Sequence, residues 1–140
     1  MRRRPYAPVL VRCVLSAAIA LPGLALAGKP AVSPAAVAEL SARADAPLIL
    51  DVRSQAEYDA GHVPGAVLIP HDELAGRLSE LDRDRWVLVY CKSGRRAGIA
   101  EALLVKEGFE VRQIEGSWNR WSAEGRPAQS VAPAAGEARR

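Results

Sequence analysis

The strongest constraint on the fold is an alternation of short, mostly apolar runs with helical patterns along the middle of the chain. Four runs have the length of strands and lie at residues 47–52, 66–69, 86–90 and 111–114. Helical patterns alternate with them at 33–43, after Ser54, and at 72–81, 96–107 and 117–123. Buried parallel strands read as continuous apolar runs, and helices then cover both faces of the sheet. We therefore predict a single-domain α/β fold around a mainly parallel sheet.

Local signals support these helices. Pro34 follows Ser33 at the first helical position, where its missing N–H is not needed. Ser54 and Glu57 form a capping-box pattern, in which each side chain satisfies a backbone donor at a helix start. Gly108 ends the helix that begins near Arg96.

Residues 1–27 have the features of a secretory signal. A basic start precedes an apolar run at 13–21, and Ala25 and Ala27 form a small-residue cleavage site. Pro22 interrupts the run, so it is shorter than the roughly 20 residues that span a bilayer. We expect removal of this signal, no stable membrane anchor and export to the bacterial periplasm. The basic start leaves the general secretory and twin-arginine routes open.

Removal of this segment changes the charge balance. The whole chain carries 19 basic and 16 acidic residues, whereas residues 28–140 keep 15 basic and 16 acidic ones, a net charge of −1. The expected mature chain therefore has no excess of positive charge, and we predict no binding to nucleic acid. It also keeps Cys91 and loses Cys13, so it cannot form an intrachain disulfide.

Composition suggests the domain boundaries. We expect residues 28–31 to form a linker and residues 32–127 one folded domain, a size that can bury a core without disulfides or metal. Residues 128–140 are rich in Ala, Pro, Ser, Gln and Gly and lack a hydrophobic period. We therefore predict a disordered tail there.

Cys91 is the strongest candidate for a catalytic residue. It directly follows a predicted strand, and functional residues of parallel α/β proteins lie at the carboxyl ends of strands. Candidate substrate-binding residues lead from it into the next helix: Lys92, Ser93, Gly94, Arg95 and Arg96. Backbone N–H groups at the helix start and the nearby cations would lower the thiol pKa and favour the thiolate. The alternative is that Cys91 is a small buried apolar side chain.

Asp51 and Arg53 are candidate supporting residues, because they end the neighbouring strand and could contact the loop after Cys91. For Arg53 we favour a pair with Glu57 across the helix start over contact with that loop.

The two histidines do not suggest a catalytic or metal site. His62, between Gly61 and a Val-Pro-Gly turn, is predicted to hold that turn by hydrogen bonding. His71 and Asp72 have no metal-ligand spacing with another histidine or cysteine. We expect no metal and no other cofactor.

Several motifs resemble those of the rhodanese-like family in order and spacing. They are Leu50–Arg53, Glu57-Tyr58, Gly61–Ala66, Ile69-Pro70, Tyr90–Arg96 and Glu115–Trp118. The resemblance implies a five-element parallel sheet and a persulfide on Cys91, formed with sulfur from thiosulfate or a related donor. The sulfur would pass to cyanide in an assay, or to a thiol or a protein acceptor in the cell. Ala97 departs from the Ser or Thr that family members often carry.

The length of the loop separates two chemistries. Cysteine phosphatases, including those that share this fold, place an arginine after five intervening residues, whereas Cys91 and Arg96 enclose four. The smaller cradle suits one added sulfur better than a phosphoryl group. We therefore expect a thiosulfate sulfurtransferase. The alternatives are a sulfur-carrier module for a partner protein, a cysteine phosphatase, and a thiol redox protein, which the lack of a second cysteine in residues 28–140 disfavours.

Overall fold

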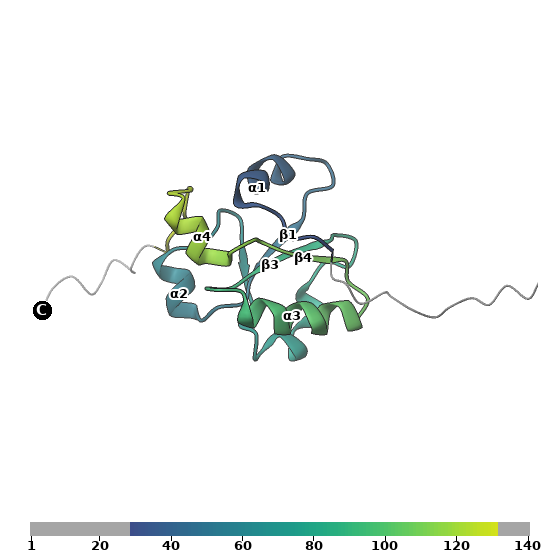
Figure 1. Cartoon of the computed structure of the whole chain (residues 1–140). Helices are drawn as coiled ribbons and strands as arrows, with labels where there is room; N and C mark the ends of the chain where they lie inside the picture. Colours follow the sequence, from purple (N-terminus) through teal and green to yellow (C-terminus); the bar gives the residue numbers. More distant parts are fainter. Residues whose placement is uncertain (1–28, 132–140) are drawn as a thin grey trace, which may run out of the picture.

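The computed structural model describes residues 29–131, so the predicted signal and residues 132–140 lie outside the described residues. Within that range, a parallel sheet has the order β2-β1-β3-β4 (Figure 1). The strands are β1 (Leu48–Asp51), β2 (Val67–Leu68), β3 (Val87–Tyr90) and β4 (Val111–Gln113). Val32 extends the sheet by a parallel bridge to Ile114. The fifth position of the expected sheet is therefore occupied by a single bridge.

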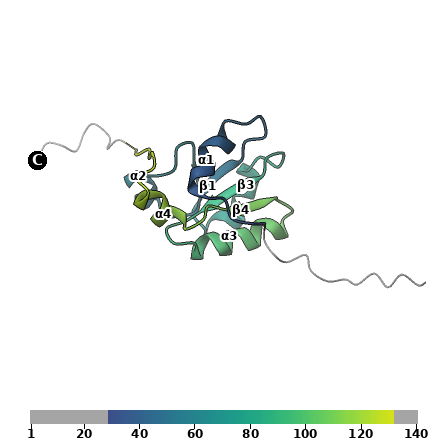
Figure 2. The ribbon, with the colours of Figure 1, turned by 45° about the horizontal axis from the view of Figure 1, so that its top comes forward.

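Two apolar layers enclose the sheet. The described helices are α1 (Pro34–Ser41), α2 (Gln55–Ala60), α3 (Arg95–Lys106) and α4 (Ser117–Ala123). Figures 1 and 2 place α1 and α3 on opposite sides of the strands. Leu50 and Val89 pack with α3 on one face, whereas Ile49 and Leu88 pack with α1 and α4 on the other. All residues of β1 and β3 are buried, which confirms the predicted α/β fold with two covered faces.

The capping box is present as predicted. The Ser54 hydroxyl accepts from the Glu57 N–H, and the Glu57 carboxylate accepts from the Ser54 N–H at 3.0 Å. These contacts fix the start of α2 at Gln55, four residues after the end of β1 at Asp51.

The prediction of a helix at 72–81 is wrong. Two short 3₁₀ turns, Leu74–Gly76 and Leu78–Glu80, occupy this segment. Arg77 interrupts them with a φ of −123° and a ψ of 15°, outside the helical region. A glycine costs a helix interior about 1 kcal/mol relative to alanine, and Gly76 lies in the middle of the segment.

The predicted start of the disordered tail at residue 128 is too early, because Ala128–Val131 has a defined backbone. Gln129 pairs with His62 through two backbone hydrogen bonds of 2.8 and 2.9 Å, and its side chain accepts from the Gly65 N–H at 3.1 Å. Amino-acid composition alone cannot predict such backbone pairing with a distant loop. None of the helices in residues 29–131 has the length and apolarity needed to cross a membrane.

Candidate active site

Cys91 lies at the carboxyl end of β3, between that strand and α3. The start of α4 holds its backbone: the Trp118 N–H donates to the Cys91 carbonyl at 2.9 Å, and the Asn119 N–H donates to the Lys92 carbonyl at 2.9 Å. The buried Ser117 hydroxyl lies 3.4 Å from the Cys91 nitrogen and accepts from it. The loop therefore has fixed anchors on both β3 and α4.

The Cys91 sulfur is surrounded by backbone donors. The N–H of Gly94, at the N-cap of α3, donates to Sγ at 3.0 Å. Gly94 has a φ of 110°, a left-handed conformation that glycine adopts without steric cost. Burial raises the pKa of Cys91, but hydrogen bonds from loop and helix N–H groups lower it by more, and the net pKa is below that of an ordinary thiol. The donors are Ala97, Gly94, Ser93 and Arg96.

The three cations near Cys91 have different environments. Lys92 and Arg95 are exposed, and neither forms a salt bridge with another residue in the range 29–131. Arg96 instead forms two parallel hydrogen bonds of 2.8 Å with the Glu57 carboxylate. These bonds lower the pKa of Glu57 to about 2, so an ionised carboxylate is paired with the Arg96 guanidinium. Mainly backbone donors, rather than side-chain charges, therefore lower the Cys91 pKa.

The predicted pair between Arg53 and Glu57 does not form. Arg53 is buried and binds both carboxylate oxygens of Asp51, with its shortest contact at 2.6 Å. Asp51 is fully buried, and a buried carboxylate is costly unless it is paired. This need directs Arg53 to Asp51 and leaves Glu57 for Arg96. Within the described residues, Arg53 and Asp51 thus form no hydrogen bond with the loop after Cys91.

Asp51 and Arg53 belong to a buried polar network beside Cys91. Tyr90 pairs with Asp51 across the β1–β3 ladder, and its hydroxyl donates to the Asp51 carboxylate at 2.6 Å. The same hydroxyl accepts from the Val63 N–H at 3.0 Å. Burial and the Asp51 charge raise the pKa of Tyr90, so it stays a neutral donor. The Arg53 guanidinium lies 4.6 Å from the ring of Trp118, which covers the network.

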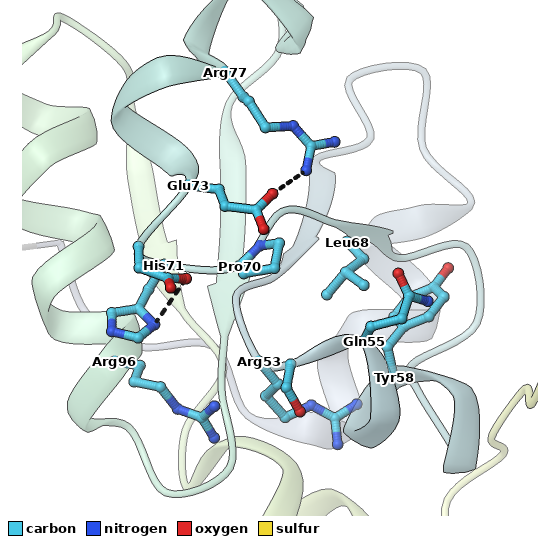
Figure 3. Close-up of a pocket in the computed structure, with 11 residues that line it drawn as sticks. Arg53, Gln55, Tyr58, Leu68, Pro70, His71, Glu73, Arg77 and Arg96 are labelled. Atoms are coloured by element: carbon cyan, nitrogen blue, oxygen red, sulfur yellow. Dashed lines mark hydrogen bonds and ion pairs between the residues drawn. The ribbon is translucent and has the colours of Figure 1, made fainter.

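An open cleft of about 570 Å³ adjoins the loop (Figure 3). In this view, Arg53 and Arg96 lie at one side of it, and Glu73 and Arg77 lie at the other. Gln55 and Tyr58 of α2 complete the wall. Cys91 itself is only 1% exposed. A substrate in this cleft would meet the Arg96 side of the loop first.

His62 holds the turn in the way that the sequence suggests. Its Nδ1 lies 2.8 Å from the Tyr58 carbonyl, and its ring stacks on the Tyr58 ring. His71 lines the cleft, with Nδ1 3.9 Å from the Asp72 carboxylate. The described part of the chain contains no group of three His, Cys, Asp or Glu side chains that could hold a metal ion.

Three supporting residues were not predicted. Glu57 holds Arg96, Ser117 contacts Cys91 and the Tyr90 hydroxyl binds Asp51. Only Tyr90 had a usable signal, since a tyrosine at the end of a buried strand needs a polar partner.

Residues 33–124 match the sequence model of the rhodanese-like domain. The chain belongs to the rhodanese-like domain family. It is 38% identical over 87 residues to an HTH-type transcriptional regulator of Mycobacterium tuberculosis, a match that spans 61% of this chain and only 38% of that protein. It is 34% identical to the thiosulfate sulfurtransferase GlpE of Pseudomonas entomophila, over 59% of this chain and 76% of the relative.

A solved structure agrees in fold. A rhodanese-related protein of Thermoplasma volcanium superposes with a TM-score of 0.66 at 28% identity, over 74% of this chain and 99% of the other. The rhodanese-like family predicted from the motifs around Cys91 is thereby confirmed, and it includes sulfurtransferases.

Proposed function

We propose that this rhodanese-like protein moves a sulfane sulfur from thiosulfate, or a similar donor, to a thiophilic acceptor through a persulfide on Cys91. The observation that carries the proposal is the hydrogen bond of 3.0 Å that the Gly94 N–H donates to the Cys91 Sγ, together with the backbone donors that lower the thiol pKa. A thiolate at this position is a ready nucleophile. The name of the Pseudomonas relative supports thiosulfate as the donor.

The reaction has two displacement steps. The Cys91 thiolate attacks the outer sulfur of thiosulfate, the S–S bond of thiosulfate breaks, and sulfite leaves with the bonding electron pair. The acceptor, cyanide or a thiolate, then attacks the outer sulfur of the persulfide and returns Cys91 to the thiolate. Loop N–H groups stabilise the negative charge on sulfur in both states.

The cations have separate roles in this proposal. Lys92 and Arg95 are exposed and attract the dianionic donor toward the loop. Arg96 is bound to Glu57, so it shapes the wall of the cleft and contributes less attraction. Ser93 and Gly94 supply backbone donors to the sulfur.

The test is thiocyanate production from thiosulfate and cyanide. Cys91→Ser should abolish turnover, and Ser79→Ala, a change at an exposed serine of the second 3₁₀ turn, should leave it unchanged. Turnover that survives Cys91→Ser would overturn the proposal. Persulfide loading without turnover would instead identify a sulfur-carrier module for a partner protein.

We also propose that the protein acts after export, on the basis of the basic start, apolar run and Ala-x-Ala site in residues 1–27. Expression in a bacterium should yield a periplasmic protein whose sequence begins at Gly28. A protein that stays in the cytoplasm with Met1 retained would contradict export.

A further inference from the structure

The outer face of α3 carries a continuous exposed stripe. Its members are Arg95, Ile99, Ala102 and Lys106, which recur at helical spacing on one side of the helix. The opposite side holds the buried residues Ala97, Ala100 and Leu104. Ile99 is 53% exposed, although it is a large apolar side chain. We call these four residues the α3 stripe.

The α3 stripe is positively charged at both ends and apolar in between. Arg95 and Lys106 form no salt bridge with another residue in the described range, and neither does Lys92 in the adjoining loop. Arg95 is the first residue of α3, where the helix dipole disfavours a cation. An anionic group bound there would relieve this repulsion.

The α3 stripe begins at the loop that holds Cys91. Arg95 follows Cys91 by four residues, and the stripe then runs for about 16 Å at 1.5 Å per residue. Figures 1 and 2 place α3 on one side of the sheet, and Arg95, Ile99, Ala102 and Lys106 are exposed on it. A protein bound along this face would bring its own thiol to the Cys91 loop at the helix start.

We propose that the α3 stripe docks a protein sulfur acceptor through an acidic, amphipathic segment. Acidic side chains of that segment face Lys92, Arg95 and Lys106, and an apolar side chain covers Ile99 and Ala102. Charge complementarity carries the choice of partner, because the exposed cations flank the apolar centre and lack internal partners in residues 29–131. This inference rests on the proposed sulfurtransferase function and names the class of acceptor.

The test compares two thiol peptides as acceptors for the thiosulfate-loaded full chain. One peptide carries Glu and Leu at helical spacing before a terminal Cys, and the other has Lys in place of Glu. Mass spectrometry follows the transfer of sulfur to each peptide, and thiocyanate formation with cyanide measures the chemistry alone. We expect faster transfer to the acidic peptide.

The double variant Ile99→Asp with Lys106→Glu tests the surface. It should slow transfer to the acidic peptide by about tenfold or more and leave the cyanide reaction unchanged, since loss of a hot-spot residue at the centre of an interface costs at least this much. Val105→Asp is the matched control, because Val105 is 49% exposed on the same helix but off the stripe. If the double variant does not fold, Ile99→Ser and Lys106→Glu are measured separately.

Equal rates with both peptides, or equal losses in the stripe variant and Val105→Asp, would overturn the docking proposal while the cyanide reaction persists. Binding of the chain to anionic phospholipid vesicles, lost in the stripe variant and without any preference between peptides, would also overturn it. Loss of the cyanide reaction in the unmodified chain would instead refute the proposed function.

Discussion

Replacing Glu57 by Gln tests whether its ion pair with Arg96 joins α2 to the active-site loop. Both hydrogen bonds are 2.8 Å long, and hydrogen bonding to Arg96 is the largest cause that lowers the pKa of Glu57 from 4.5 to about 2. At about 1.4 kcal/mol per pKa unit, this corresponds to about 3 kcal/mol. Because the two side chains are 27% and 29% exposed, screening by solvent reduces the expected loss to about 1–2 kcal/mol.

The loss of stability in the Glu57→Gln variant should depend on pH. A carboxylate whose folded-state pKa is depressed stabilises the fold above its unfolded pKa of 4.5, and this stabilisation is lost as the pH falls toward about 2. The Glu57→Gln variant should therefore unfold about 1–2 kcal/mol more easily in urea at about pH 7, and the difference should shrink as the pH approaches 2.

The control is Asp59→Asn, which removes a carboxylate from the same helix. Among the described side chains, only Gln55 donates a hydrogen bond to the Asp59 carboxylate, and this bond is exposed. The Asp59→Asn variant should change stability little at any pH. A Glu57→Gln difference that is constant with pH, or that matches the Asp59→Asn difference, would show that the ion pair with Arg96 does not stabilise the fold.

Three further predictions concern the loop and the network beneath it. Gly94→Ala places a Cβ at a φ of 110°, so it should lower the free energy of unfolding by about 1–2 kcal/mol and reduce sulfurtransferase turnover. Gly76→Ala is the control, because a Cβ there meets open space, and it should change neither quantity. Equal effects of the two variants would contradict a requirement for glycine at position 94. The rate of Cys91 alkylation by iodoacetamide should rise with pH around a midpoint below that of free cysteine, and a midpoint at or above that of free cysteine would contradict the lowered pKa. Tyr90→Phe leaves the buried Asp51 carboxylate without one donor and should lower the free energy of unfolding by about 1–3 kcal/mol, measured in urea; an unchanged value would show that the hydroxyl contributes nothing.

The fold could be predicted from the sequence where burial is continuous. The runs that became β1 and β3 are apolar because helices cover them on both faces, and Cys91 directly follows β3. The capping box was equally readable, because Ser54 and Glu57 interact over one helical turn. Local chemistry of this kind needs no knowledge of the rest of the chain.

Pairings between distant segments could not be predicted. Arg96 and Glu57 are 39 residues apart, and only the parallel register of β1 and β3 brings α2 and the start of α3 together. Arg53 lies four residues from Glu57, yet it forms its ion pair with the buried Asp51 carboxylate. The ordering of Gln129 depends in the same way on a loop far along the chain.

In the proposed reaction, Cys91 carries the transferred sulfur. Peptide mass spectrometry of the protein, treated or not treated with thiosulfate, tests this directly, with the peptide that contains Cys13 as an internal reference when it is present. One added sulfur atom is expected on the Cys91 peptide alone, and cyanide should then remove it as thiocyanate. Thiocyanate turnover with no sulfur gained on Cys91, or sulfur gained equally on Cys13, would contradict this role of Cys91.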